Sequence, residues 1–272
     1  MFKEIGQRII AAVMSFTRLP MSGFGIIPKE KFERVVVLWP LVGWLTGATM
    51  AVVLWLSLCV LPLGVSVLLA LLARVVLTGA MHEDGLADFC DGMGGGTTRE
   101  RRLAIMKDSH IGTFGVLGLV AYALLLWSAW QGVALGSMRL YGGALLGQQP
   151  LWNIPQVAAL MVAADAFAKG ASAQIINLLP YARKAEEAKN RLIYKRMSGW
   201  ELAVCLLAAM LPTLLLVPMH FWWTMLGSLI AALLMMLAMH RRLGGYTGDC
   251  CGACFCVSET AYVLLVLVLQ GW

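Results

Sequence analysis

Long runs of uncharged, mostly apolar residues alternate along the chain with short polar segments. The runs cover residues 35–73, 111–138, 140–164, 202–239 (with one histidine) and 260–272. A helix needs about 20 apolar residues to cross a bilayer, and these runs lack the alternation of barrel strands. The pattern therefore predicts an all-α fold, a polytopic helical membrane bundle. We expect about seven transmembrane helices, at roughly residues 35–58, 63–81, 112–130, 140–165, 200–217, 221–239 and 257–271.

The fourth expected span is interrupted by Pro150 and Pro155, because proline removes a helical N–H donor. A further helical piece is expected to continue to Leu179. No long polar linker divides the chain, so we expect residues 1–272 to form a single membrane-embedded catalytic domain.

Basic residues are grouped in the segments that join the apolar runs. Lys and Arg cluster at 3–34, 99–107, 183–196 and 241–242, and cytoplasmic loops of membrane proteins carry such an excess. This predicts a multi-pass membrane protein with its N-terminus inside and its C-terminus outside. Topology then explains the net charge of +6 without a nucleic-acid partner. Residues 1–20 mix four charged side chains with apolar ones, which predicts an amphipathic helix on the membrane surface.

Composition agrees with a bilayer environment. The chain is 60% hydrophobic and 13% charged, against about 25% charged residues in soluble domains. Such an apolar surface is compatible with a homo-oligomer. Four of the seven cysteines lie between 250 and 256, in a cytoplasmic segment where disulfides are disfavoured. Cys251 and Cys254 have the spacing of zinc ligands, but no second pair completes such a site, so we expect them to pack.

Acidic side chains concentrate in the segment that starts at His82. Asp84, Asp88 and Asp91 are spaced i, i+4, i+7, so on a helix the three carboxylates line one face. Like charges this close repel unless a cation lies between them. Oxygen ligands that no His/Cys quartet accompanies favour Mg²⁺ or Mn²⁺ over zinc. We therefore expect the metal ligands to be Asp84, Asp88 and Asp91, with Gly85 letting a phosphate approach the backbone.

Later polar segments carry further candidates. Thr97 and Glu100 have capping-box spacing and predict a short helix. A cluster follows at Lys107, Asp108, Ser109 and His110, and a basic loop begins at Arg183. Groups of this kind favour an anionic ligand, although a basic run is also typical of a surface that binds anionic lipid.

Ionisable residues also occur inside the apolar segments, where they are costly and indicate function by default. Lys169 and Asp165 lie one helical turn apart, and the alternative is that they pair only with each other. Asp249 follows a glycine-rich turn and opens the last helix, where it could equally be an N-cap. Glu259 is expected to be either a ligand or the partner of a cation.

Four ordered stretches together resemble one family, the adenosylcobinamide-GDP ribazoletransferases, also called cobalamin 5′-phosphate synthases. The stretches are His82–Gly92, Met106–Gly115, Tyr181–Arg183 and Gly244–Ala253, preceded by Phe16–Pro20. The resemblance implies an integral membrane enzyme of late cobalamin biosynthesis. It would join adenosylcobinamide-GDP to α-ribazole or its 5′-phosphate and release GMP, with Mg²⁺ required.

The resemblance and the residue patterns together give a set of expected site residues. The expected catalytic residues are Asp84, Asp88, Asp91 and Asp249. The expected substrate-binding residues are His82, Lys107, Asp108, Ser109, Lys169, Arg183 and Glu259.

The expected chemistry fits these residue types. One or two divalent ions on the aspartates would bridge the diphosphate and stabilise the leaving GMP. The 3′-hydroxyl of α-ribazole would attack phosphorus, and Asp91 or Asp249 would accept its proton. A transporter is an alternative, but its coupling site would lie near the bilayer midplane and the halves show no internal repeat. A CDP-alcohol phosphotransferase would need an Arg after Ala87, where Asp88 stands.

Overall fold

The protein is an all-helical bundle. The computed structural model describes residues 2–21, 23, 25–141, 154–183 and 194–271, and these residues contain helices and no β-strand. In chain order the helices are α1 Phe2–Phe16, α2 Lys29–Phe32, η2 Val35–Leu38, α3 Trp39–Leu58, α4 Leu63–Thr78, α5 Met81–Gly95, α6 Arg99–Ile105, α7 Thr113–Tyr141, α8 Ile154–Ala173, α9 Ile175–Leu178, α10 Gly199–Leu216, η5 Met219–Phe221, α11 Thr224–Leu243 and α12 Gly248–Gln270.

The predicted polytopic membrane fold is confirmed. Within the described residues, six helices are long and apolar enough to cross a bilayer, and a seventh span results if the bent pair α4 and α5 counts as one. The fourth span lies at Pro155–Leu178 and not at the predicted 140–165. Pro155 lies in the first turn of α8, where a missing N–H costs no helical bond, so it begins the helix instead of interrupting it. Residues 142–153 of that prediction, with Pro150, lie outside the described residues.

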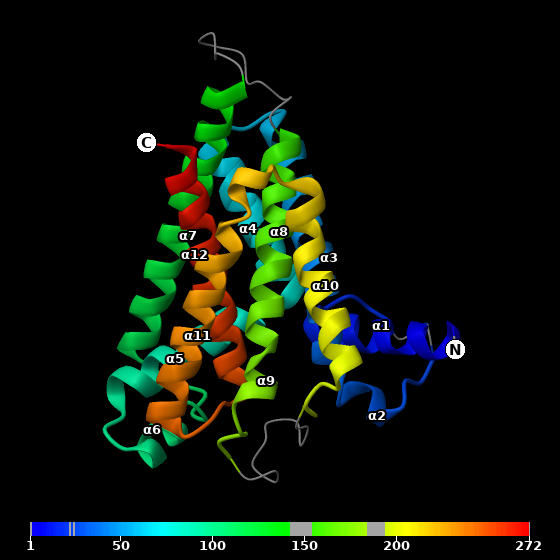
Figure 1. Ribbon diagram of the computed structural model, residues 1–272. Helices are drawn as coiled ribbons and strands as arrows, with labels where there is room; N and C mark the ends of the chain where they lie inside the picture. Colours follow the sequence, from blue (N-terminus) through cyan, green and yellow to red (C-terminus); the bar gives the residue numbers. More distant parts are fainter. Residues whose placement is uncertain (1, 22, 24, 142–153, 184–193, 272) are drawn as a thin grey trace.

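Helix α8 lies inside the bundle (Figure 1). In its apolar window 83% of the residues are buried, against 22% for α7, so α7 presents most of its apolar surface outward, as a lipid-facing helix must. Helix α3 packs closely on α8 because it has glycines at the contact. A Cβ on Gly43 would stand 2.6 Å from Cα of Ala166, and one on Gly47 would stand 2.6 Å from Cα of Val162.

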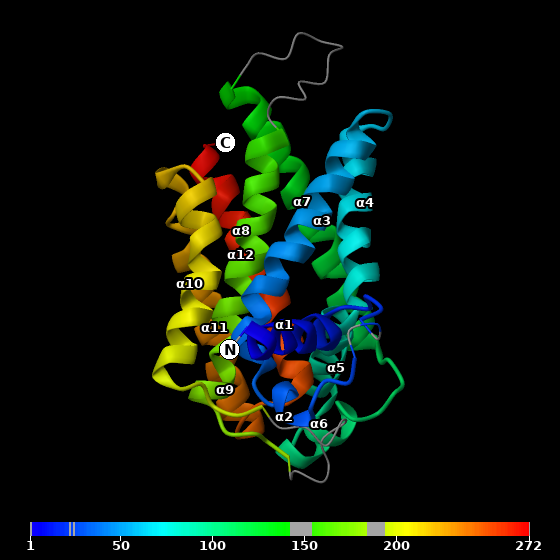
Figure 2. The same ribbon diagram turned by 90° about the vertical axis from the view of Figure 1, so that its right-hand side faces the viewer.

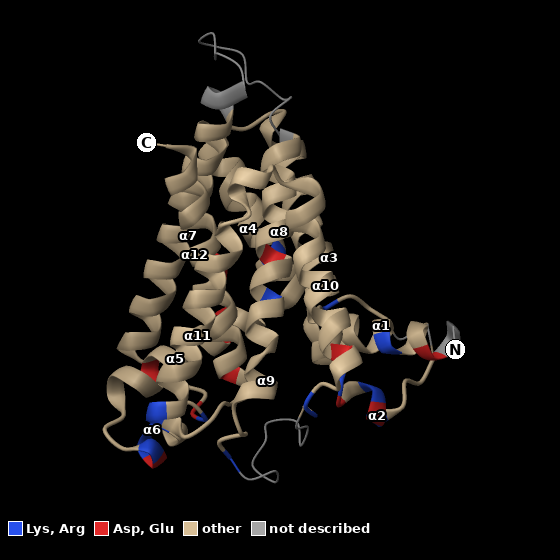
Figure 3. Ribbon diagram, viewed as in Figure 1, with Lys and Arg blue, Asp and Glu red and all other residues tan. Residues whose placement is uncertain are grey.

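The predicted N-terminal amphipathic helix is present as α1. It lies across the bundle near one end and not along it (Figure 2). It buries Ala11, Ala12 and Phe16 and exposes Ile5 and Ile9. Charged residues gather at this same end of the molecule, apart from a group within the bundle (Figure 3). The polar segments therefore share one end of the bundle, whereas the C-terminus lies at the other (Figure 1).

The carboxylate of Glu201 connects α1 to the bundle. Its carboxylate accepts from the backbone N–H of Ser198 and forms a capping box at the start of α10. It also pairs with Arg34, and with Arg8 of α1 at 3.6 Å. The side chain of Glu201 is only 6% exposed, so α1, α10 and the segment before α3 meet at a buried carboxylate.

A sharp break separates α4 from α5. The two helices are bent by 89°, and the turn consists of Gly79 (φ 67°) and Ala80 (φ 58°), both in the left-handed region. A non-glycine residue there costs about 1–2 kcal/mol. The backbone N–H of Arg18 donates to the carbonyl of Leu77 at 2.8 Å, which attaches the end of α1 to this turn. The break starts a new helix at Met81, directly before the predicted acidic motif.

The short helix α6 begins as predicted but with a different cap. Thr98 is the N-cap, and its hydroxyl accepts from the N–H of Arg101. The predicted capping box between Thr97 and Glu100 is therefore wrong by one residue. With arginine at the third helical position, no carboxylate is available for the reciprocal bond.

Candidate functional site

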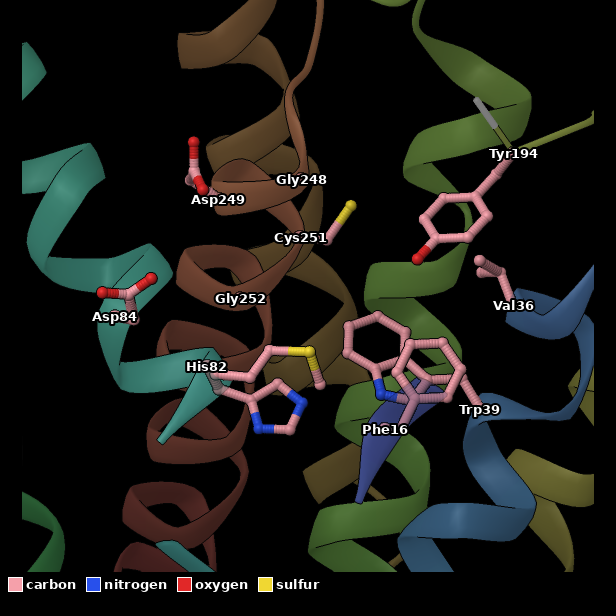
Figure 4. A pocket seen from close by; sticks show the side chains of 11 residues that line it. Phe16, Val36, Trp39, His82, Asp84, Tyr194, Gly248, Asp249, Cys251 and Gly252 are labelled. Atoms are coloured by element: carbon pink, nitrogen blue, oxygen red, sulfur yellow. The ribbon is translucent and has the colours of Figure 1, made fainter. Parts of the chain in front are cut away.

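A cavity of about 220 Å³ lies at the charged end of the bundle, where α5 meets the start of α12. We call it the acidic cavity (Figure 4). Its lining comes from α1, η2, α3, α5 and α12 and from the segment before α10; the lining residues are Phe16, Val36, Trp39, Met81, His82, Asp84, Tyr194, Gly248, Asp249, Cys251 and Gly252. It combines two carboxylates with aromatic and aliphatic walls.

Two glycines bring α5 and α12 into backbone contact beside this cavity. A Cβ on Gly85 would stand 2.6 Å from the carbonyl oxygen of Asp249, and a Cβ on Gly252 would stand 2.9 Å from that of His82. Real Cβ atoms do not approach other atoms so closely, and backbone cannot move aside cheaply. The glycine predicted to admit a phosphate therefore has an observed packing role: it sets the approach of Asp84 and Asp249.

The predicted catalytic aspartates divide between two environments. Asp84 is exposed and Asp249 is 8% exposed, and both line the acidic cavity. Figure 4 shows their carboxylates on the same side of it. Asp88 follows Asp84 by one helical turn and is half-buried.

Asp91 faces a different helix. Its Oδ2 accepts from the N–H of Gly112 at 2.7 Å and its Oδ1 accepts from that of Gly115 at 2.8 Å. It therefore caps the N-terminus of α7, where the helix dipole favours a carboxylate. Among the described residues, no group of three or more His, Cys, Asp and Glu side chains could hold a metal ion by itself.

Aromatic rings form one wall of the acidic cavity. Trp39 stacks on Phe16 and on His82, with ring centroids 5.4 and 5.7 Å away. Phe255 meets both His82 and Trp39, with ring centroids 4.5 and 6.2 Å away, so these three rings pack around one another. His82 is 1% exposed. The structure thus places this predicted substrate-binding residue on the cavity wall.

Tyr194 adds a hydroxyl to this wall. Burial raises its pKa well above the ordinary value, so the group stays protonated at neutral pH. Figure 4 shows the hydroxyl directed toward Trp39 and Phe16.

A second, wider cavity of about 660 Å³ carries the predicted basic residues Lys107 and Arg183, together with Arg99. We call it the basic cavity. Its other lining residues are Glu100, Leu103, Ala104, Tyr181 and Ala182. Three cationic side chains around one carboxylate give it the charge that suits phosphate oxygens.

Hydrogen bonds to backbone carbonyls connect the basic cavity to the acidic one. Arg99 donates to the carbonyls of Leu243 and Ala182 at 2.6 and 2.9 Å. The backbone N–H of Ala182 donates to the carbonyl of Tyr246 at 2.8 Å. Tyr246 lies three residues before Asp249. The short segment that joins Tyr246 to Asp249 therefore links the residues bound by Arg99 to the carboxylate of the acidic cavity.

Asp108 and Ser109 lie elsewhere, exposed in the loop between α6 and α7. The hydrogen bond from the ring of His110 at 2.7 Å is the main cause that lowers the pKa of Asp108. Neither residue is among those that line the two cavities. The prediction that they bind substrate therefore gains no geometric support from this arrangement.

Lys169 and Glu259 lie within the bundle, with no exposed surface. Lys169 pairs with Asp165 and donates to the hydroxyl of Thr46 at 3.1 Å. Glu259 pairs with Arg74. The structure therefore joins these two predicted binding residues in a buried ionic network, and neither lines the acidic or the basic cavity.

The network centres on a residue that the sequence patterns did not single out. Arg74 is 1% exposed and lies 3.8 Å from Asp165 and 3.7 Å from Glu83. It also donates to the hydroxyl of Tyr122 at 2.8 Å. The sequence does carry a signal for Arg74, since it is a single arginine between two apolar stretches. A charge at membrane depth either is functional or pairs with an opposite charge. Trp39, Tyr194 and Arg99 were missed as well, since aromatic and basic residues are common at membrane interfaces.

Comparison with known proteins identifies relatives over almost the whole chain. Residues 8–268 match the family described as cobalamin-5-phosphate synthase. The chain is 35% identical to an adenosylcobinamide-GDP ribazoletransferase of Shewanella baltica, over 98% of this chain and 95% of the relative. It is also 35% identical to the protein of that name from Vibrio cholerae, over 97% and 95%. No solved structure gives a significant match.

Proposed function

Because this chain belongs to the cobalamin-5-phosphate synthase family, we propose that it transfers ribazole in cobalamin biosynthesis by the reaction that names its relatives. Adenosylcobinamide-GDP and α-ribazole or its 5′-phosphate would be joined, and GMP would leave. The observation that carries this proposal is the position of Asp84 and Asp249 on one cavity, with three cationic side chains in the cavity beside it.

The donor set of the acidic cavity suits Mg²⁺. Magnesium is usually held by one or two carboxylates together with substrate phosphates and water, and not by a complete protein cage. Asp84, on the wall of the acidic cavity, would supply one carboxylate, and Asp88, one turn later on α5 and outside the cavity lining, would supply the other; Mn²⁺ accepts the same ligands. The ion would neutralise charge on the diphosphate. Asp91, predicted as a third ligand, already accepts two backbone amides; we propose that it holds α5 against α7.

The other site residues would take part in the transfer itself, as proton acceptor and as phosphate ligands. The 3′-hydroxyl oxygen of the ribazole forms a bond to the phosphorus that carries the cobinamide arm, and the bond from that phosphorus to GMP breaks. Of the two predicted proton acceptors, Asp91 and Asp249, we propose that Asp249 takes the hydroxyl proton; its position in the same cavity as Asp84, where it is mostly buried, supports this role. Lys107, Arg99 and Arg183 would hold phosphate oxygens of the nucleotide.

We also propose the orientation of the protein in a bacterial inner membrane. The two cavities lie at the end that carries the basic segments, and such segments favour the cytoplasm. The reaction would therefore take place at the cytoplasmic face, where nucleotide substrates are available.

The proposal is tested by measuring GMP release from purified protein in lipid, supplied with both substrates and with Mg²⁺ or EDTA. Asp84→Asn and Asp249→Asn should each lower the rate by at least about a hundredfold, as expected for loss of a catalytic group. Glu30→Gln, which changes an exposed acid of α2 away from both cavities, should leave the rate unchanged. Near-normal GMP release by folded Asp84→Asn would contradict the assignment of the site.

A further inference from the structure

The side chains of the acidic cavity supply many hydrogen-bond acceptors and few donors. Asp84 and Asp249 present carboxylate oxygens, which only accept hydrogen bonds when they are ionised. Phe16, Val36 and Met81 have no N–H or O–H group in their side chains. The substrate parts proposed for this cavity, a ribose hydroxyl and a diphosphate, bring acceptor oxygens of their own. A donor on the cavity wall is therefore needed to bind them.

The nitrogen and sulfur donors of the wall do not meet this need. The indole Nε1 of Trp39 and both ring nitrogens of His82 are buried behind the cavity surface, so a molecule in the cavity does not reach them. The thiol of Cys251 is a weak donor, and it is directed to the backbone carbonyl of Thr247 at 3.7 Å. These three side chains offer the cavity no strong donor.

Tyr194 differs from the other lining residues. It is half-buried and lines the acidic cavity. Figure 4 shows the hydroxyl end of its side chain between Cys251 and Trp39. A phenol hydroxyl is a strong donor that can also accept. Among the residues that line this cavity, all of which the structure describes, Tyr194 is thus the one whose side chain brings a strong donor to the cavity surface.

The chain next to Tyr194 holds it in place. The backbone N–H of Lys195 donates to the carbonyl of Glu33 at 2.9 Å. The backbone N–H of Met197 donates to Oδ1 of Asn177 at 2.9 Å. The ring of Tyr194 packs against the hydrophobic core. Because the donor is already fixed before a ligand arrives, little conformational entropy is lost when it binds.

We propose that the hydroxyl of Tyr194 donates a hydrogen bond to an acceptor oxygen of the substrate that is held beside Asp84 and Asp249. This inference rests on the proposed function. The oxygen belongs either to the ribose of the ribazole or to the diphosphate of the nucleotide substrate. Both offer the same chemistry to a phenol, and the experiment distinguishes them.

The test compares two matched substitutions by equilibrium binding to purified protein in lipid. Tyr194→Phe keeps the aromatic ring and removes the hydroxyl. Tyr262→Phe removes the hydroxyl of a fully buried tyrosine of α12, which lies 3.1 Å from the hydroxyl of Thr213 and lines neither cavity. Labelled α-ribazole and labelled GDP, the latter with Mg²⁺, serve as separate probes.

Tyr194→Phe should weaken the binding of one probe and leave the other within about twofold. A loss of about 2- to 10-fold confined to α-ribazole, the value of a hydrogen bond to a neutral oxygen, assigns the acceptor to the ribazole. A loss of about 10- to 100-fold confined to GDP, the value of a hydrogen bond to a charged oxygen, assigns it to the diphosphate. The unaffected probe shows that the variant is folded, and Tyr262→Phe should bind both probes as the wild type does.

The inference is overturned if Tyr194→Phe binds both probes as tightly as the wild type, if it weakens both by the same factor, if Tyr262→Phe has the same effect, or if the wild type binds neither probe. GMP release by the wild type from the two complete substrates is measured with the same preparation. Absence of GMP release would refute the proposed function. Normal release together with unchanged binding of both probes by Tyr194→Phe would refute only the role of Tyr194.

Discussion

The buried ionic network makes a quantitative prediction about stability. Arg74 is 1% exposed and pairs with Glu259, and Asp165 and Glu83 lie within 4 Å of it. Replacing Arg74 by Met keeps a long apolar side chain but leaves these three carboxylates with Lys169 as the remaining cation of the network. Removing one partner of a buried pair costs about 3–5 kcal/mol, because the other charge stays buried and unpaired. That is a large part of a typical folding free energy of about 5–15 kcal/mol.

A double variant shows whether the stability loss of Arg74→Met comes from leaving Glu259 unpaired. In Arg74→Met/Glu259→Met both members of the closest pair are absent, and a buried pair replaced by apolar residues of similar size is often close to neutral. We therefore expect the double variant to be more stable than Arg74→Met alone, by about 2 kcal/mol or more. If the losses in unfolding free energy of Arg74→Met and Glu259→Met add up to that of the double variant, the two residues do not stabilise each other directly.

The assay is reversible unfolding by SDS in mixed micelles, followed by far-ultraviolet circular dichroism. Arg241→Met is the matched control, because Arg241 is exposed at the end of α11 and should change the free energy of unfolding by no more than about 0.5 kcal/mol. A loss below about 1 kcal/mol for Arg74→Met would refute the argument.

Three further substitutions test the contacts around the site. Gly85→Ala places a Cβ 2.6 Å from the Asp249 carbonyl oxygen; we expect a loss of about 1–3 kcal/mol in unfolding free energy and slower GMP release, and unchanged kinetics would contradict the close packing. Asp91→Ala removes the acceptor of two α7 amides and should cost about 1–2 kcal/mol, measured by thermal unfolding; full retention of stability would show that the cap is dispensable. Glu201→Gln loses the charge that pairs with Arg34 and should cost about 1–2 kcal/mol, whereas the double change with Arg34→Met should cost little more.

Much of the fold could be predicted from hydrophobic pattern alone. The expected spans 35–58, 200–217 and 221–239 end within four residues of the observed spans, because an uncharged run of this length has no alternative structure in a bilayer. The span at 140–165 was misplaced, since the pattern does not show whether a proline begins a helix or interrupts it. The left-handed Ala80 at the α4–α5 break also carries no signal in composition or periodicity.

The candidate site was only partly predictable. Spacing placed Asp84, Asp88 and Asp91 on one helix, and α5 confirms that helix. Spacing did not show that Asp91 would cap α7, because the amides that it accepts lie 21 and 24 residues later in the chain. The partner of Glu259 is 185 residues away. Contacts of this range depend on how helices pack, and helix packing is not visible in a local pattern.

The turn at Gly79 and Ala80 determines where the acidic residues can act. If residues 63–95 formed one straight rod, Asp91 would stand about 20 Å past Thr78, at about 1.5 Å per residue. The carboxylates would then lie too far from α7 and α12 to approach them. The 89° bend instead turns α5 toward these two helices. A change that straightened this corner would therefore disable the site while every acidic side chain remained in place.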